Sequence, residues 1–246
     1  VLDYSNLVFV KITDFELPAP APHGLDISNN GEFLFVASNT SDWVYKVNTE
    51  SGEIVNEIFI TDPNSPLPPE TEINYNKPIQ LKYFDGKVFL TCSAGKFYNG
   101  QTEENIPGKI MILSSEDLHI ITSYNFEWHS TPWHIAIDEE NSELFVALAG
   151  DMGNMGSAGI AHLSFQNNDF IHHWTTTGVE FSTCHGVAIS KKYNQVYLSG
   201  RGNGILHSLN KNDGSILQSI NVLMDNHSHD HGGHSHGAML GGIAVH

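Results

Sequence analysis

Cysteine and basic residues are scarce in this sequence, and each scarcity narrows the possible functions. The 246 residues include two cysteines, Cys92 and Cys184, which form no CxxC pair and are too few for a disulfide framework. Only 11 residues are Lys or Arg, against 28 Asp or Glu, so the formal net charge is -17. Nucleic acid and anionic membranes are therefore poor partners, and we expect no nucleic acid to bind.

Long hydrophobic runs and familiar catalytic motifs are also missing. No apolar run approaches the roughly 18 to 20 residues needed to cross a bilayer, so we expect no transmembrane segment. The sequence has no GxSxG, HExxH, phosphate-binding loop or CxxCH haem site, and we assign no catalytic residue. With 40% hydrophobic and 10% aromatic residues, the chain can nevertheless bury a large core.

An internal repeat of just over 50 residues organises the chain. The same apolar alternation recurs, at spacings of 56, 54, 52 and 56 residues, in Leu25–Ile27, Leu81–Tyr83, Ile135–Ile137, Val187–Ile189 and Ile243–Val245. Three more short strands follow in each of the first four units, joined by turns such as Asn29–Gly31 and Asp85–Gly86 that favour tight hairpins. This pattern predicts an all-β fold, a β-propeller of four-stranded antiparallel blades with the aligned strands innermost.

The repeat boundaries predict a single propeller domain over residues 1–246. Blade repeats are expected at about 22–60, 77–126, 132–175 and 184–222, the start of another at 238–246, and the outer strand of a closing blade at 7–15. Four blades and one further inner strand do not close a ring, and an open arc would expose sheet edges. We therefore expect the chain to be incomplete at its C-terminus and part of a seven-bladed ring, with a five-bladed ring as the alternative.

The first repeat resembles a known family. Residues 22–38, PHGLDISNNGEFLFVAS, followed by 44–53, VYKVNTESGE, are similar to the YVTN-type propeller repeat of bacterial and archaeal extracytoplasmic proteins. The unit at 184–222 is similar, and the likeness covers most of residues 20–222. The resemblance implies a propeller in the periplasm or on the cell surface of a bacterium, and it carries no site residues across. The second unit departs from the pattern, with Pro78-Ile-Gln80 in place of the His-Gly pair.

The strand order predicts that all long loops share one face. In a four-stranded meander, the first and third turns lie at one end of the blade, and the remaining connections lie at the other end. The long connections all belong to this second set: 61–77, 93–109, 149–158, 200–204 and 223–237. Long, chemically biased loops on one face of a rigid scaffold usually form the binding face, so we expect function there.

The last of these loops contains five closely spaced histidines. They alternate with Gly, Ser and Asp and are His227, His229, His231, His234 and His236. Imidazole is a common ligand of late first-row metals, and flexible spacers let a short chain wrap its donors around one ion. We predict that the loop binds a transition metal ion, copper if methionine thioethers join the imidazoles, or zinc if Asp225 or Asp230 does. A solvated low-complexity segment is the alternative.

Three more histidines fall at the start of the predicted inner strands, on the same face. His23, His134 and His185 are therefore candidate metal ligands at the channel mouth. The alternative is a structural role, in which each imidazole bonds a neighbouring backbone carbonyl. We interpret His162 and His207 as equivalent, structural positions on third strands. For the two cysteines we favour packing over ligation.

Taken together, these features favour a non-enzymatic extracytoplasmic binding protein. It would capture a metal ion or a small metal-bearing ligand and pass it to an envelope partner such as an outer-membrane transporter. A flexible polyhistidine loop suits capture better than catalysis, because a reactive centre needs ligands locked by their own hydrogen bonds. One alternative is a copper-dependent periplasmic redox enzyme with a multi-histidine centre. Another is a protein-interaction scaffold with an incidental histidine tract.

Overall fold

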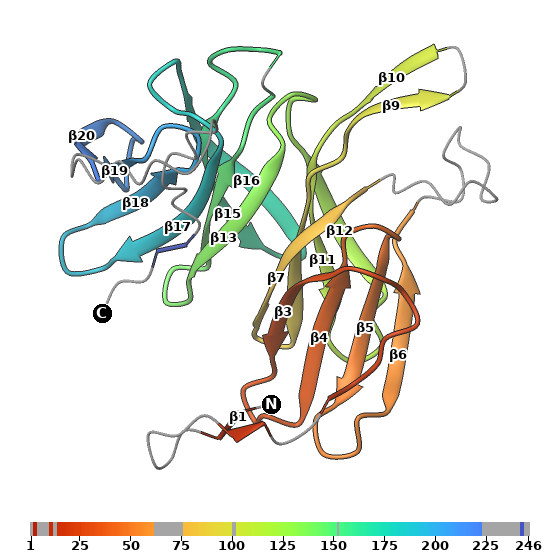
Figure 1. Cartoon of the computed structure of the whole chain (residues 1–246). Coiled ribbons are helices and arrows are strands. Elements are labelled where there is room, and N and C mark those ends of the chain that lie inside the picture. Colours follow the sequence, from red (N-terminus) through yellow and green to blue (C-terminus); the bar gives the residue numbers. More distant parts are fainter. Residues whose placement is uncertain are drawn as a thin grey trace.

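The described chain is built from β-strands alone. The computed structural model describes residues 2–3, 10–11, 14–61, 76–99, 102–151, 153–222 and 242–243. Within these residues no helix is long and apolar enough to cross a membrane. Four antiparallel sheets of four strands follow one another along the chain, and Figure 1 shows them side by side in an arc. The predicted all-β fold of four-stranded propeller blades is confirmed.

Each blade is a meander in which consecutive blade strands pair. Blade one contains β3 (Pro22–Ile27), β4 (Phe33–Ser38), β5 (Trp43–Asn48) and β6 (Ile54–Phe59). Blade two contains β7 (Pro78–Phe84), β8 (Lys87–Cys92), β11 (Lys109–Ser114) and β12 (Ile120–Asn125). Blade three contains β13 (Pro132–Asp138), β14 (Glu143–Leu148), β15 (Gly159–Gln166) and β16 (Asp169–Thr177). Blade four contains β17 (Cys184–Ser190), β18 (Gln195–Gly200), β19 (Ile205–Asn210) and β20 (Ile216–Asn221).

Four short strands lie outside the blades. Within the predicted loop at 93–109, β9 (Gly95–Asn99) pairs with β10 (Thr102–Ile106) to form a hairpin. Near the N-terminus, β1 (Leu2–Asp3) pairs with β2 (Val10–Lys11), so the only strand within the predicted outer strand at 7–15 pairs with no blade. The rest of that prediction falls largely outside the described residues, as does the repeat at 238–246 apart from residues 242–243.

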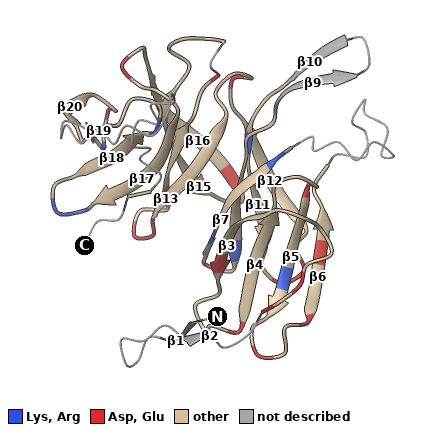
Figure 2. Cartoon of the chain, viewed as in Figure 1, with Lys and Arg blue, Asp and Glu red and all other residues tan. Residues whose placement is uncertain are grey.

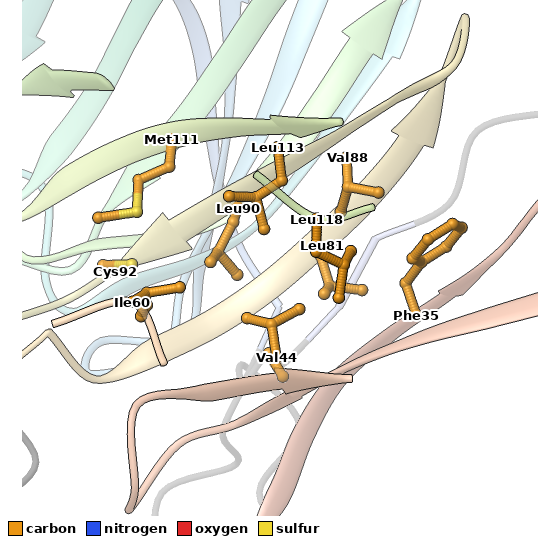
Figure 3. Packing of buried hydrophobic residues seen from close by; sticks show 11 residues of the cluster. Phe35, Val44, Ile60, Leu81, Val88, Leu90, Cys92, Met111, Leu113 and Leu118 are labelled. Carbon is orange, nitrogen blue, oxygen red and sulfur yellow. The ribbon is translucent and has the colours of Figure 1, made fainter. Parts of the chain in front are cut away.

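The core lies between the blades, because each sheet buries both of its faces. Figure 3 shows the cluster between blades one and two, where Phe35 and Val44 meet Leu81, Val88 and Leu90. Alternate residues of a strand face opposite sides, so the neighbouring side chain Phe89 joins the next cluster, between blades two and three. A third cluster joins blades three and four. Each fully buried side chain of this size contributes about 1.5–3 kcal/mol, which fixes the blades face to face.

The first strand of each blade is the innermost, as predicted. β3 neighbours β7, β7 neighbours β13, and β13 neighbours β17. Gly24 of β3 lies so close to blade two that a Cβ there would be 2.5 Å from the Ile79 carbonyl oxygen. In blade four, a Cβ on Gly186 would lie 3.0 Å from the Gly242 Cα. Gly242 of the fifth repeat therefore lies beside β17.

The two ends of the blades carry different connections. At the short-turn end, where first and third turns meet, the Thr49 N–H donates to the Glu32 carbonyl over 3.0 Å. Figure 2 shows acidic residues at several of these turns. At the opposite, long-loop end, the Asp42 carboxylate accepts hydrogen bonds from the backbone of Asn76 at 2.8 Å and Lys77 at 2.9 Å. The second turn and the connection between blades one and two thus share an end, as the strand order predicted.

Candidate functional site

Every inner strand begins with the same local irregularity. The residue just before it has a positive φ in all four blades: Ala21 at 54°, Lys77 at 51°, Thr131 at 49° and Thr183 at 47°. Shortly afterwards the pairing with the second strand shifts by one residue, which is a β-bulge. The extra residue falls at His23, at Ile79, within Trp133–His134 and within His185–Gly186. Bulges re-aim side chains and are common beside binding sites.

Four rings from three inner strands gather at these bulges. Trp133 stacks on His185 with ring centroids 4.4 Å apart and meets His23 edge-on at 5.8 Å. The His134 ring lies 6.0 Å from His185. We refer to His23, Trp133, His134 and His185 as the ring cluster. The structure thus brings together the three histidines predicted at the channel mouth, at the long-loop end of the blades.

His23 has a structural partner. Its Nδ1 lies 2.8 Å from the carbonyl oxygen of Ile79, on the inner strand of the next blade. A carbonyl only accepts, so Nδ1 carries the proton and donates it, which leaves Nε2 for any other interaction. This is the structural role that the sequence offered as the alternative to metal ligation.

His134 and His185 differ from His23. No other described residue forms a hydrogen bond with their ring nitrogens, although both side chains are at least partly buried. Burial lowers the pKa of each to about 4, and nearby positive groups add to the effect, Lys82 beside His134 and Arg201 beside His185. Both imidazoles are therefore neutral at pH 7 and can offer a lone pair to a metal ion.

A complete metal site is not formed by the described residues. Among them, no group of three or more His, Cys, Asp or Glu side chains is placed to hold an ion. His134 and His185 would supply two of the four donors that a tetrahedral zinc site needs. The five loop histidines, His227, His229, His231, His234 and His236, lie outside the described residues. Metal binding by the loop stays a prediction.

The cysteines are packing residues. Cys92 and Cys184 are unpaired and have no exposed surface. Burial raises the pKa of the Cys184 thiol to about 12 and that of Cys92 further. Both thiols are protonated at pH 7 and belong to the apolar clusters between the blades, which agrees with the packing role favoured from the sequence.

The interpretation of His162 and His207 as equivalent positions was wrong. Leu163 pairs with Leu144, and Leu209 pairs with the corresponding Val196, so His162 matches the position of Ser208. A one-residue offset sends side chains to opposite faces of a sheet. His162 stacks on Phe145, with centroids 4.4 Å apart, whereas Nδ1 of His207 lies 2.9 Å from the Ser219 hydroxyl.

Two parts of the site escaped the sequence reasoning. Trp133 is the first, although it occupies the same repeat position as His23 and His185, so aligning the repeats by position would have found it. The second is a hollow of about 340 Å³ at the long-loop end. It lies between the loop at 149–158 and residues 179–183, and Thr183, two residues before His185, is part of its wall. Two loops from adjacent blades form it, and no motif within either loop predicts their meeting.

Comparison with known proteins supports the fold. No protein-family profile matches the sequence, and no curated protein matches it. The chain is similar in structure to a streptogramin B lyase, with a TM-score of 0.58, 14% identity, and 84% of this chain and 56% of that one covered. It is also similar to the periplasmic gluconolactonase of Pseudomonas aeruginosa, with a TM-score of 0.59, 14% identity, and coverage of 82% and 54%. A hydrazine synthase of Kuenenia stuttgartiensis gives a TM-score of 0.56, 12% identity, and coverage of 77% and 53%.

These likenesses extend to the propeller fold alone, because identities this low do not carry function. The chain spans about half the length of these three proteins. The resemblance to YVTN-type repeats and the seven-bladed ring stay predictions.

Proposed function

We propose that this protein is an extracytoplasmic binding protein that captures a transition metal ion, copper or zinc, or a small metal-bearing ligand at its long-loop end. The observation that carries the proposal is the pair formed by His134 and His185, whose rings lie 6.0 Å apart on adjacent inner strands. Neutral imidazoles without a described hydrogen-bond partner are suited to coordinate a borderline metal ion.

The histidine loop is the source of the missing donors in this proposal. Gly242, which follows the loop in sequence, lies beside Gly186, the residue next to His185. Five residues lie between His236 and Gly242, so six Cα–Cα steps of at most about 3.5 Å each span roughly 21 Å in a fully extended chain. This tether keeps the end of the loop within reach of the fixed pair. Histidines from this loop, added to the two inner-strand ligands, would complete the site for reversible capture.

The proposed localisation of the protein and its proposed delivery partner are based on the sequence. The resemblance to YVTN-type repeats favours the periplasm or the bacterial cell surface and an envelope partner such as an outer-membrane transporter. A non-enzymatic role is preferred because five histidines spaced by Gly, Ser and Asp suit ion capture better than a redox centre, whose ligands are fixed by their own hydrogen bonds.

The test is a calorimetric titration of protein purified without nickel resin, using copper(II) and then zinc(II). One variant replaces the five loop histidines by Ser, and a second combines His134→Ala with His185→Ala. The matched control combines His119→Ala with His172→Ala, which removes two exposed imidazoles elsewhere in the blades. We expect each test variant to lose at least about tenfold in affinity, and the control to bind like the parent.

Thermal unfolding of each variant checks that the fold is retained. If both test variants bind as the parent does, the proposal is wrong. If only the loop variant loses affinity, the inner-strand pair is not part of the site.

A further inference from the structure

The hollow near the histidine pair is larger than a metal ion needs. Its volume is about 340 Å³, which falls in the range of roughly 300–1,000 Å³ that is usual for small-molecule sites. A metal ion held by four ligands at about 2.0–2.3 Å occupies only the space between its donors. The size of the hollow therefore favours an organic ligand over a bare ion.

The wall of the hollow has unused hydroxyl groups. Ser182 and Thr183 line it, and neither hydroxyl forms a hydrogen bond with another described residue. In contrast, the Ser157 hydroxyl is taken up by its own loop, at 2.8 Å from the Asp151 N–H and 2.7 Å from the Asn154 carbonyl. Ser182 and Thr183 can therefore bond a hydroxylated or carboxylated ligand.

Among the described residues that line the hollow, Asp151 is the one carboxylate. Its Oδ1 accepts a hydrogen bond of 3.0 Å from the Gly153 N–H. This hydrogen bond satisfies one carboxylate oxygen of Asp151 within its own loop. Because like charges repel, a ligand anion would lie away from Asp151, on the side of the hollow formed by Ser182, Thr183 and Gly202.

Arg201, the only arginine of the chain, adjoins that side of the hollow through its backbone. Its backbone N–H donates to the Thr183 carbonyl over 3.1 Å, and its neighbour Gly202 lines the hollow. The guanidinium forms no ion pair with any described carboxylate, whereas Lys191 and Lys211 at the short-turn end do so at 3.2 Å and 2.7 Å. An unmatched guanidinium in a chain of net charge -17 points to an anionic ligand, because its planar fork fits a carboxylate.

Geometry also links this cation to the histidine pair. Thr183 lies two residues before His185, so their Cα atoms are at most about 7 Å apart. Lys82 provides a second cation on β7, the inner strand beside β13. Positive charge therefore flanks both candidate ligands, which is unfavourable for a bare metal cation and favourable for a metal in an anionic complex.

We propose that the ligand is a small hydroxycarboxylate that carries the metal ion. Its carboxylate pairs with Arg201, its body occupies the hollow against Ser182 and Thr183, and its metal ion reaches His134 and His185. This inference rests on the metal-binding function proposed above and names the chemical class of the ligand.

Equilibrium dialysis with radiolabelled citrate, a hydroxycarboxylate that chelates copper(II), tests the proposal. The full chain is dialysed against labelled citrate with and without an equimolar amount of copper(II), and both label and copper are measured. The test variant is Arg201→Gln. The matched control is Lys109→Gln, which removes one positive charge at the same end of the blades, from a third strand instead of the inner strands.

We expect the parent and Lys109→Gln to retain citrate and copper together, and Arg201→Gln to bind labelled citrate about tenfold more weakly. Unchanged melting temperatures exclude unfolding as the cause. Copper retained without citrate would overturn the hydroxycarboxylate proposal and leave metal capture standing. If neither is retained, metal capture itself fails. Equal citrate retention by Arg201→Gln and the parent would remove Arg201 from the site.

Discussion

A charged cluster at the short-turn end is internally paired, whereas three polar side chains beside the inner strands at the long-loop end are not. At the short-turn end, between blades three and four, the buried Asp138 carboxylate bonds to the Lys211 ammonium, which also lies 2.7 Å from Glu143. At the long-loop end, His134, His185 and Arg201 form no hydrogen bond through their side chains and no ion pair with any described residue.

The contrast separates stability from binding. Buried polar groups are normally satisfied, because an unsatisfied one costs about 1–3 kcal/mol. The matched charges of Asp138 and Lys211 therefore fasten the two blades together. The unmatched groups at the other end remain available, and a ligand would supply their partners. Each prediction below tests whether these two roles are separable.

The largest effect is expected from Lys211→Met. Asp138 is only 1% exposed, and the substitution leaves its charge without its main partner. We expect the free energy of unfolding, measured by urea denaturation, to fall by about 3–5 kcal/mol. Copper affinity at the long-loop end should stay unchanged. Lys192→Met, at an exposed neighbouring position, is the control and should change stability by no more than about 0.5 kcal/mol. A loss below about 1 kcal/mol for Lys211→Met would contradict the fastening role.

The pH dependence of stability gives the next effect. Burial lowers the pKa of His162 and His185 to about 4, whereas the unfolded chain titrates near 6.5. The unfolded state therefore binds more protons between these two values, and stability should fall as pH drops from about 6.5 towards 4. The expected slope is at most about 1.4 kcal/mol per pH unit for each histidine.

Urea denaturation at pH 7, 6 and 5 measures this slope. His185→Gln should reduce it by the contribution of one proton, since the amide does not titrate. A slope equal in parent and variant would show that His185 is not held neutral by the fold.

Gly24→Ala tests how rigid the long-loop end is. The new Cβ would meet the Ile79 carbonyl oxygen at 2.5 Å and the Gln80 Cα at 2.6 Å, both backbone atoms. We expect a loss of about 1–3 kcal/mol in the free energy of unfolding. Gly153→Ala is the control, because its nearest contact would be an ordinary 3.6 Å. If both variants are equally stable, the inner strands can move apart to accept the new methyl group, and the long-loop end is less rigid than their close approach indicates.

The smallest effect is expected from His23→Ala, which removes the hydrogen bond to the Ile79 carbonyl. Stability should fall by about 1 kcal/mol, and copper affinity should change little, since His134 and His185 remain. His185→Ala should change stability little and reduce copper affinity at least tenfold. The contrast fails if His23→Ala reduces copper binding as strongly as His185→Ala does.

The sequence predicted the blades well because their packing follows local alternation. The second blade, for example, was predicted at about 77–126, and its strands run from Pro78 to Asn125. Contacts between blades were harder to predict from the sequence. Asp138 and Lys211 are 73 residues apart, and their meeting depends on the register of two separate sheets.

The candidate site was predicted in part, for the same reason. The repeat placed His23, His134 and His185 at one end of the inner strands, but identical repeat positions have different neighbours. His23 faces a carbonyl of blade two, while His185 stacks on Trp133. The bulges, which decide these surroundings, leave no mark in the apolar alternation.

The bulge that begins each inner strand also bears on how such a protein can diversify. After gene duplication, the residues beyond the bulge remain under the constraint of blade packing, while the extra residue lies outside that alternation. The four blades already differ there, with His23, Ile79, Trp133 and His185 at the same repeat position. Because this one position accommodates side chains as different as the buried Ile79 and three aromatic rings, new chemistry can evolve at the end of the strands while the pairing of the strands stays as it was.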